Sequence, residues 1–369
     1  MIRVLVLSSN LVFASGITRV IKNLIDYSDK SRIQYTIATL DDARNDMVDY
    51  FKSIDVEVVI IPPLSILGVS KVKAFLKDLI FTYQFDIIHS HFFQIDGIVF
   101  PIAKKNNIKF ISHSHSSELS EIKWKAIRNQ ILFSRGSKQA DYWAACSKLA
   151  GIALFGRKFT NSNKSLLVKN GIDCGSFEID INARQVIRKE YGISDSTRLI
   201  GNIGRFSPTK NQQYLLYIIK ALLDAGEDYK LMLVGNGPTY SQVLSLAKQL
   251  NIEKHVIFTG EKHNTPAYLS AFDVFVMPSI HEGLGITAIE AQANGLDCVI
   301  SDTIPEEVDV TGIIRLPLSQ LYENWADSIR KLPCIHHPEY NKMVVNAGYE
   351  IRDVAYNMQL FYLKILKND

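Results

Sequence analysis

Cysteine is scarce in this chain of 369 residues, and its four cysteines, Cys146, Cys174, Cys298 and Cys334, are widely spaced. Because they form no Cys-x-x-Cys pair and no dense framework, we expect neither a disulfide-stabilised secreted domain nor a cysteine-ligated zinc site. The chain also lacks the run of about 18 apolar residues that crosses a bilayer. Its start, MIRVLVLSS, predicts a strand and lacks the cleavage site of a signal peptide. These absences predict a cytoplasmic protein whose contact with a membrane is at most peripheral.

Two motifs that often mark nucleotide enzymes are missing as well. The loop after the first predicted strand reads SSNLVFASG and is not Gly-x-Gly-x-x-Gly, so a dinucleotide-dependent oxidoreductase is poorly supported. The chain contains no Asp-x-Asp, the metal-binding motif of many sugar-transferring enzymes. A nucleotide chemistry that depends on either motif is therefore not expected.

The positive charge is concentrated in the first half of the chain. Residues 101–170 contain 13 lysines and arginines against 3 acidic residues, whereas the whole chain has a net charge of only +3. Within this region, residues 119–139 predict a basic helix with Trp124, Ile127, Ile131 and Leu132 on one side. Such a helix either rests on an anionic membrane or packs on its own domain. Nucleic acid is a weaker candidate, because no recognition motif accompanies the charge.

Short apolar runs alternate with amphipathic ones along the whole chain, which is typical of an α/β fold with parallel sheets. A length of 369 residues fits two domains of roughly 150 to 200 residues. Strands are predicted in the first half near 3–8, 33–40, 56–62, 86–91, 109–115, 141–146 and 165–169. In the second half they are predicted near 198–204, 230–235, 255–259, 273–277 and 297–301. The boundary between the halves is expected near residue 175.

Two predicted strands of the first half end in the same tripeptide, His-Ser-His. The histidines are His89 and His91 on one strand and His113 and His115 on the next. Residues at i and i+2 share one face of a strand, so four imidazoles could gather at one edge of the sheet. One interpretation is a metal site, although no carboxylate or cysteine accompanies the four histidines. The simpler interpretation is that they are polar residues at the edge of a sheet.

The most informative stretch is MPSIHEGLGITAIEAQAN, residues 277–294. A buried strand ends before Pro278, and the glycines at 283 and 285 precede a helix that is predicted to run to about Asn294. Bare backbone at the start of a helix suits phosphate or sugar oxygens, and in open α/β sheets ligands bind at the carboxyl ends of strands. Glu282 lies before this helix and Glu290 lies within it, so each could meet a different end of one ligand.

Three further segments follow strand ends in the second half. GNIGRFSPTKN places Arg205 and Lys210 before a helix that is predicted to begin near Asn211. LMLVGNGPTY places Gly235, Asn236 and Gly237 at the end of the next strand. GEKHNTPAYLSAFDVFVMPS carries Lys262 and His263.

Together these motifs resemble the donor site of the retaining glycosyltransferases of family 4, also called group 1. The motifs on which the resemblance rests are Pro-Ser, Glu-Gly-x-Gly, the Glu-x7-Glu pair and Gly-Arg-(x)4-Lys. The resemblance is strong over residues 198–302 and weakest in the first half. It implies the GT-B fold, in which two Rossmann-like, doubly wound parallel-sheet domains face a cleft and the last helix crosses back to the first domain. The expected domains are 1–175, with a helix at about 345–369, and 176–344 for donor binding.

The resemblance also implies roles for individual residues. Arg205 and Lys210 hold the diphosphate in place of a metal, Glu290 binds the ribose hydroxyls, and Glu282 holds the sugar. The terminal histidine of the fifth strand points at the donor sugar, which indicates His115, with His113 as the second choice. The full set of expected donor contacts is Gly16, Arg205, Lys210, Gly235, Asn236, Lys262, His263, Glu282, Gly283, Leu284, Gly285, Ile286 and Glu290. The matching loop in the first domain of the family is glycine-rich, whereas in this chain Gly16 is the only glycine of that loop.

The function implied is transfer of a sugar from a nucleoside-diphosphate sugar, with UDP favoured, with retention of configuration and without a metal cofactor. The segment CVISDTIPEEVDVTG is similar to members that build capsular and other cell-surface polysaccharides in bacteria, so the expected acceptor is a saccharide or a lipid-linked saccharide. Two alternatives remain. One is a sugar-nucleotide epimerase of the same fold, and the other is a protein that binds a sugar nucleotide without turnover.

Overall fold

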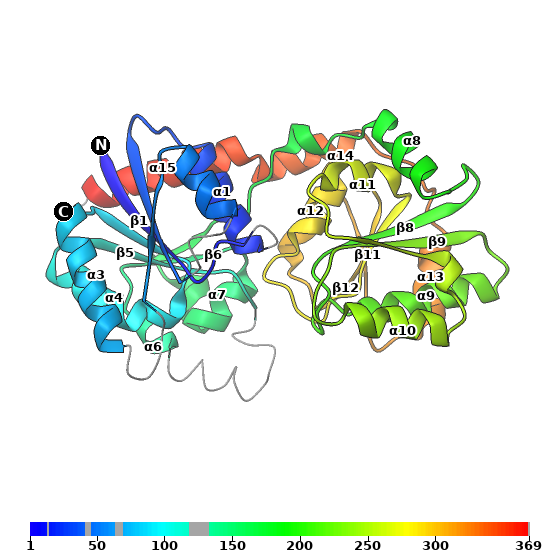
Figure 1. Ribbon diagram of the computed structural model, residues 1–369, viewed down its shortest axis with the longest axis horizontal. Helices are drawn as coiled ribbons and strands as arrows, with labels where there is room; N and C mark the ends of the chain where they lie inside the picture. Colours follow the sequence, from blue (N-terminus) through cyan, green and yellow to red (C-terminus); the bar gives the residue numbers. More distant parts are fainter. Residues whose placement is uncertain (13–14, 41–45, 63–68, 118–132, 368–369) are drawn as a thin grey trace. The chain divides into compact units, whose positions relative to one another are not determined.

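The computed structural model of the protein describes residues 1–12, 15–40, 46–62, 69–117 and 133–367. The chain divides into two compact units, one formed by Met1–Gly171 and Ile351–Asp369 and the other by Ile172–Glu350. Each unit has one parallel β-sheet with helices on both of its faces (Figure 1). The chain passes from the first unit to the second after Gly171. The sequence analysis expected this boundary near residue 175.

The first unit has a seven-stranded sheet in the order β3-β2-β1-β4-β5-β6-β7, parallel throughout. Its strands are β1 (Ile2–Ser8), β2 (Ile33–Thr39), β3 (Glu57–Ile60), β4 (Ile87–Ser90), β5 (Lys109–Ser114), β6 (Tyr142–Ala145) and β7 (Ser165–Leu167). Its helices are α1 (Gly16–Asp26), α2 (Asp46–Ser53), α3 (Val69–Tyr83), α4 (Asp96–Lys105), α6 (Ser134–Ser137), α7 (Lys148–Phe155) and α15 (Ile351–Lys367).

The second unit has a six-stranded parallel sheet in the order β10-β9-β8-β11-β12-β13. Its strands are β8 (Arg198–Ile203), β9 (Tyr229–Val234), β10 (Val256–Gly260), β11 (Val274–Met277), β12 (Cys298–Ser301) and β13 (Ile314–Leu316). Its helices are α8 (Ile181–Glu190), α9 (Gln212–Asp224), α10 (Tyr240–Gln249), α11 (Thr265–Ala271), α12 (Ile286–Ala293), α13 (Tyr322–Arg330) and α14 (Glu339–Val344).

The strands are apolar because helices cover both faces of each sheet. All four residues of β11 and all four of β12 are buried, as expected for central parallel strands. In both sheets the strand order reverses between two central neighbours, β1 with β4 and β8 with β11. The loops that leave these neighbours therefore diverge to opposite faces of the sheet, which opens a crevice at the carboxyl ends of the strands.

The end of the chain returns to the first unit, as the GT-B resemblance predicts. Helix α15 packs beside α1, and Ile351, Met358 and Tyr362 are buried in the core of that unit (Figure 1). The helix predicted at about 345–369 begins a few residues later than the sequence indicates. Gly348 adopts φ 80°, which ends the helical path after α14, and α15 begins anew at Ile351.

Three other comparisons with the sequence concern individual segments. Strand β13 at the sheet edge was not predicted, because it has only three half-buried residues. Most of the basic stretch 119–139 lies outside the described residues, and its described part contains only the short helix α6. Among the described residues, no helix has the length and apolarity to span a bilayer.

Candidate active site

The Arg205–Asn211 and Pro278–Glu282 segments leave the carboxyl ends of β8 and β11, which are neighbours in the sheet. Three contacts join the two segments. The Ile280 N–H donates to the Thr209 carbonyl over 2.7 Å, and the Asn211 side chain donates to the Pro278 carbonyl over 3.1 Å. The third is an ion pair between Lys210 and Glu282. Two motifs about 70 residues apart in sequence thus form one structural feature.

The Lys210–Glu282 ion pair is close and largely shielded from water. Lys210 Nζ lies 2.6 Å from Glu282 Oε1, and the two side chains are 25% and 10% exposed. A charge-assisted hydrogen bond of this length, largely shielded from water, is stronger than an exposed ion pair. The pair fixes where the ammonium group lies before any ligand arrives.

The turn after β9 lies directly against the turn after β8. Gly235 has φ 139°, and a Cβ atom there would lie 2.1 Å from the Gly204 carbonyl oxygen. Gly237 would meet the Phe206 carbonyl oxygen at 2.3 Å. Between them, the Asn236 carbonyl accepts from the Phe206 N–H over 2.9 Å. Glycine is needed at both positions for this close approach, which sets the backbone beside Arg205.

The Glu-x7-Glu helix begins at a left-handed glycine. Gly285 caps α12 with φ 93°, and Ile286 is the first residue of the helix, directly after the two glycines as the sequence indicates. Leu284 is 2% exposed, so its side chain belongs to the core and any role in binding falls to its backbone. Glu290 is fully buried inside the helix. A buried carboxylate is costly unless polar partners satisfy it, which is typical of a binding position.

The remaining predicted residues of the second unit form no side-chain hydrogen bond or ion pair with Lys210 or Glu282 among the described residues. The Arg205 side chain is exposed, and its carbonyl accepts from the Gln212 side chain over 3.1 Å. Lys262 lies over the ring of Tyr268, with Nζ 5.9 Å from the centroid. His263 is exposed in the loop before α11, and Gly283 is half-buried in the loop before α12. The structure thus joins Lys210 to Glu282 by a direct contact and places Arg205 in the same loop as Lys210.

In the first unit, the four histidines gather at the carboxyl ends of β4 and β5. His91 Nδ1 lies 2.6 Å from His115 Nε2, and His89 Nε2 lies 3.0 Å from His113 Nδ1. His113 Nε2 is buried and has no hydrogen-bond partner in the part of the chain that the structure describes. Gly16, the other predicted residue of this unit, begins α1, and a Cβ atom there would meet open space.

The histidine cluster is electrostatically neutral. Burial lowers the pKa of His89 and of His115 to about 3, and it lowers those of His91 and His113 well below 6.5. The neighbouring imidazoles lower the pKa values of His89, His91 and His113 further, because like charges repel. Neutral imidazoles each donate one hydrogen bond and accept another, so the cluster can position hydroxyl groups of a sugar.

The sequence analysis missed Tyr362, which contacts the cluster, and Asp96, which binds serines adjacent to the histidines in sequence. The Tyr362 hydroxyl of α15 lies 2.7 Å from His89 Nδ1. Asp96 accepts from Ser90 and Ser137 over 2.6 Å each, and also from Ser112. Burial raises the pKa of Asp96 to about 6, and the serine hydroxyls oppose that rise. In the sequence, Ser90 lies between His89 and His91, and Ser112 precedes His113. These serines were the only sequence feature that could have pointed to Asp96.

The histidines also offer a test of the metal interpretation. The ligand atoms of His89, His91 and His113 lie within 4.8 Å of one another. Nitrogens on one tetrahedral zinc ion are separated by roughly 3.4 Å, given bonds of about 2.0 to 2.1 Å. The hydrogen bonds to Tyr362 and between His89 and His113 already engage both ring nitrogens of His89. The expectation that no metal is required stays a prediction.

Comparison with known proteins identifies the class. Residues 183–312 match the model for glycosyl transferases group 1, and residues 14–176 match the model for glycosyltransferase family 4. EpsF of Bacillus subtilis, a glycosyltransferase by name, is 31% identical over 351 residues, which cover 91% of this chain and 90% of EpsF. The chain belongs to the family 4, or group 1, glycosyltransferases, and its fold is GT-B.

Two further proteins illustrate the range of the similarity. The capsular polysaccharide biosynthesis glycosyltransferase CapH of Staphylococcus aureus is 27% identical over 257 residues, 67% of this chain and 68% of CapH. The crystal structure of Anabaena HepE in complex with UDP and glucose matches with a TM-score of 0.79 and 16% identity, covering 100% of both chains. At that identity the structural likeness supports the fold alone.

Proposed function

We propose that the protein is a retaining glycosyltransferase that moves a sugar from a nucleoside-diphosphate sugar, with a UDP-sugar favoured, to a saccharide or lipid-linked saccharide in the synthesis of a cell-surface polysaccharide. The observation that carries the proposal is the joining of the Arg205–Asn211 and Pro278–Glu282 segments at the crevice of the second sheet. The name of CapH supports the polysaccharide context.

The donor diphosphate is assigned to the loops after β8 and β9 and to the start of α12. Arg205 and Lys210 supply two positive charges, and the amides of Gly283 to Ile286 supply N–H donors at a helix N-terminus. Glu290 takes the ribose hydroxyls, while backbone near Lys262 and His263 holds the base. Glu282 holds Lys210 and accepts from the sugar, because a carboxylate has several acceptor positions.

In the transfer itself, the bond between the sugar carbon and the diphosphate oxygen breaks, and a bond forms between that carbon and the acceptor oxygen. The acceptor proton passes to the departing diphosphate. Arg205 and Lys210 stabilise the charge that develops on that group, so no metal is needed. His115, with His113 as the alternative, contacts the donor sugar from the first unit as a neutral imidazole.

The acceptor side is assigned to the first unit, whose basic segment 101–170 attracts the inner face of the cell membrane and so reaches a lipid-linked acceptor. An epimerase or a sensor without turnover is not favoured, because the family models and the relatives named above are transferases.

The first experiment is a melting-temperature screen against UDP, GDP and their sugars, followed by a transfer assay with the donor that stabilises most. A ligand at a hundred times its dissociation constant stabilises by about 2.7 kcal/mol, which is readily seen as a shift in melting temperature. We expect UDP to stabilise the protein and Lys210→Ala to abolish that shift. If no nucleoside diphosphate raises the melting temperature, the proposed donor site is wrong.

A further inference from the structure

Three buried side chains of the first unit form a hydrogen-bonded series that ends at an unpartnered nitrogen. The Tyr362 hydroxyl lies 2.7 Å from His89 Nδ1, and His89 Nε2 lies 3.0 Å from His113 Nδ1. None of the three residues is more than 2% exposed. At the far end of the series, His113 Nε2 is buried and has no hydrogen-bond partner among the residues that the structure describes. Because solvent is excluded from these contacts, the side chains themselves set where each proton lies.

Each member of the Tyr362–His89–His113 series holds one proton. Burial raises the pKa of Tyr362 well above 10, so its hydroxyl stays protonated. Burial lowers the pKa of His89 to about 3 and that of His113 well below 6.5, so both imidazoles are neutral. A neutral imidazole donates from one ring nitrogen and accepts at the other. Two arrangements therefore fit the contacts, one with every donor directed toward His113 and one with every donor directed toward Tyr362.

The contact between Tyr362 and His89 decides between the two arrangements. The phenol is the more acidic of these two groups and the imidazole nitrogen is the more basic, so an O–H···N bond is stronger than the reverse N–H···O bond. Tyr362 therefore donates to His89 Nδ1, and His89 carries its proton on Nε2. His89 in turn donates to His113 Nδ1, which places the proton of His113 on Nε2. The unpartnered nitrogen at the end of the series is thus an N–H donor.

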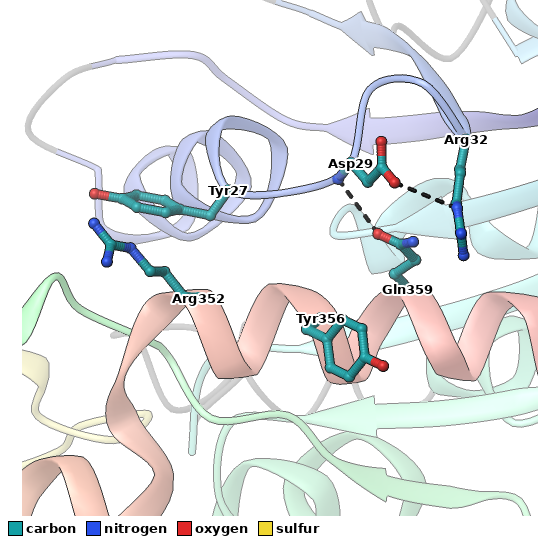
Figure 2. A pocket seen from close by; sticks show the side chains of 6 residues that line it. All are labelled: Tyr27, Asp29, Arg32, Arg352, Tyr356 and Gln359. Atoms are coloured by element: carbon teal, nitrogen blue, oxygen red, sulfur yellow. Dashed lines mark hydrogen bonds and ion pairs between the residues drawn. The ribbon is translucent and has the colours of Figure 1, made fainter.

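Helix α15 is held against the first unit one turn before Tyr362. The Asp29 N–H donates to Gln359 Oε1 over 3.3 Å, and Gln359 is 5% exposed. Figure 2 shows this bond between α15 and the turn that follows α1, beside a pocket that Arg352 and Tyr356 also line. Residues three positions apart are neighbours on a helix surface, so Gln359 and Tyr362 share the buried side of α15. The Tyr362 hydroxyl is therefore brought to His89 by a helix that is anchored at an adjacent position.

We propose that Tyr362 is a positioning residue that fixes the tautomers of His89 and His113, so that His113 presents its Nε2–H to an oxygen of the donor sugar. A buried N–H without an acceptor is unfavourable, and a bound oxygen removes that cost. His113 belongs to the carboxyl-terminal end of β5, where parallel sheets bind their ligands. The His115 ring stacks on the His113 ring with centroids 4.1 Å apart and is only half-buried, and an entering sugar displaces it to reach Nε2. This role rests on the proposed function, which supplies the sugar, and it makes His113 rather than His115 the residue that donates to it.

The first test is nitrogen NMR of the full-length protein with isotope-labelled histidine and without nucleotide. The shifts of the two ring nitrogens distinguish a protonated nitrogen from an unprotonated one, and the signals lost in a His113→Gln variant assign those of His113. The parent protein should carry the His113 proton on Nε2 alone. In Tyr362→Phe both arrangements leave one donor and one acceptor unpaired, so we expect a mixture of the two tautomers. A parent protein with the proton on Nδ1, or a tautomer that Tyr362→Phe leaves unchanged, would overturn the role of Tyr362.

The second test separates the two ring nitrogens of His113 by substitution. Glutamine places its amide near the Nε2 position, whereas asparagine places its amide near the Nδ1 position. His113→Asn should weaken binding of the UDP-sugar that the melting-temperature screen selects about tenfold, whereas His113→Gln should weaken it less than about threefold. Both variants should bind UDP like the parent protein, because UDP has no sugar for His113 to meet. Equal losses of UDP-sugar binding in the two variants, or an equal loss for UDP alone, would overturn the contact with the sugar.

The matched control is Tyr356, which also lies on α15 but is 59% exposed (Figure 2). Tyr356→Phe removes the same hydroxyl from the same helix, so the tautomer of His113 should stay as in the parent and UDP-sugar affinity should change less than about twofold. A tautomer change as large as that in Tyr362→Phe would show that the helix as a whole, and not the Tyr362 hydroxyl, sets the proton. Melting curves report whether each variant folds, and Tyr362→Phe keeps the buried ring. If no UDP-sugar binds the parent protein, the proposed function fails, whereas the tautomer of His113 is still measured without any nucleotide.

Discussion

Lys210 Nζ lies 2.6 Å from Glu282 Oε1, so the cation of one motif is held by the carboxylate of another that follows 72 residues later. Both side chains are mostly shielded from water, at 25% and 10% exposure. Lys210, which the proposed function assigns to the diphosphate, is thereby positioned before a ligand binds. Preorganisation of this kind reduces the reorganisation needed when charge develops on the leaving group.

The pair should behave as one unit in catalysis. We expect Lys210→Ala to lower kcat/KM about a hundredfold, with a comparable loss for Glu282→Ala. The double variant should lose little more than the worse single one, because each substitution already removes the shared arrangement. Steady-state transfer by the four proteins measures this coupling. Independent, multiplicative losses would show that the contact has no role in turnover.

The control for that cycle is Lys220 with Asp224, an exposed ion pair on α9 that is spaced four residues apart. Such pairs contribute well under about 1 kcal/mol. Lys220→Ala should therefore leave transfer within twofold of the parent.

Glu290 should select the ribose. The side chain is fully buried in α12, and a hydrogen bond from a hydroxyl to a carboxylate contributes about 1.5 to 3 kcal/mol. Glu290→Gln should weaken UDP binding roughly tenfold but leave the binding of 2′,3′-dideoxy-UDP unchanged, since that analogue has no hydroxyls to lose. Titration calorimetry with both nucleotides provides the comparison. Equal weakening for both would mean that Glu290 acts only on the fold.

The histidine cluster should make the first unit sensitive to acid. The four imidazoles are neutral when folded, because burial lowers their pKa values, to about 3 for His89 and His115. They take up protons on unfolding below pH 6.5, so their contribution to stability is complete above that pH and declines as the pH falls. His89 and His115 together remove about 3 kcal/mol between pH 7.5 and 5.5, at about 1.4 kcal/mol per proton and pH unit, and His91 and His113 act in the same direction.

Asp96 acts in the opposite direction. Its folded pKa is raised to about 6, so its contribution is present at low pH and declines as the pH rises through 6, which offsets about 1 kcal/mol of the loss. Urea unfolding at several pH values measures the net slope. His91→Gln should reduce the slope by about one proton, whereas His255→Gln in the other unit serves as the control. A slope unchanged by His91→Gln would contradict the neutral cluster.

Transfer should proceed without a divalent metal. The chain contains no Asp-x-Asp, and Arg205 and Lys210 follow the same strand. Activity in excess EDTA should equal that in its absence. Loss of transfer that magnesium or manganese restores would refute the assignment of the two cations as the substitute for a metal.

Much of the fold follows from local pattern. The strands predicted near 198–204 and 273–277 are present as β8 and β11, because short apolar runs bounded by turn residues are unmistakable when a sheet is covered on both faces. Strand β13 was missed because three half-buried residues are too few to show an alternation of apolar and polar positions. The break at Gly348 was missed since a glycine within an amphipathic run is also tolerated in a continuous helix.

The site was less accessible from the sequence, because its contacts join distant residues. Tyr362 and His89 are 273 positions apart, and nothing local to either residue indicates the other. The Lys210–Glu282 contact depends on the strand order, which places β8 beside β11. The sequence motifs identified Lys210 and Glu282 as site residues but did not predict that the two side chains are in contact. Asp96 carried no signal beyond the serines around it, because serine and aspartate are common where a helix begins.

Arg205 gives the most direct test of the donor site. Its side chain is exposed in the loop after β8, so Arg205→Ala should melt like the parent protein. Its planar fork can hold two phosphate oxygens, and losing one preorganised donor to a developing anion costs roughly 10² to 10³ in kcat. The measurement is steady-state transfer by Arg205→Ala beside its melting curve. We predict a loss of that size with an unchanged melting temperature, whereas an intact variant that transfers sugar within about threefold of the parent would place the diphosphate elsewhere.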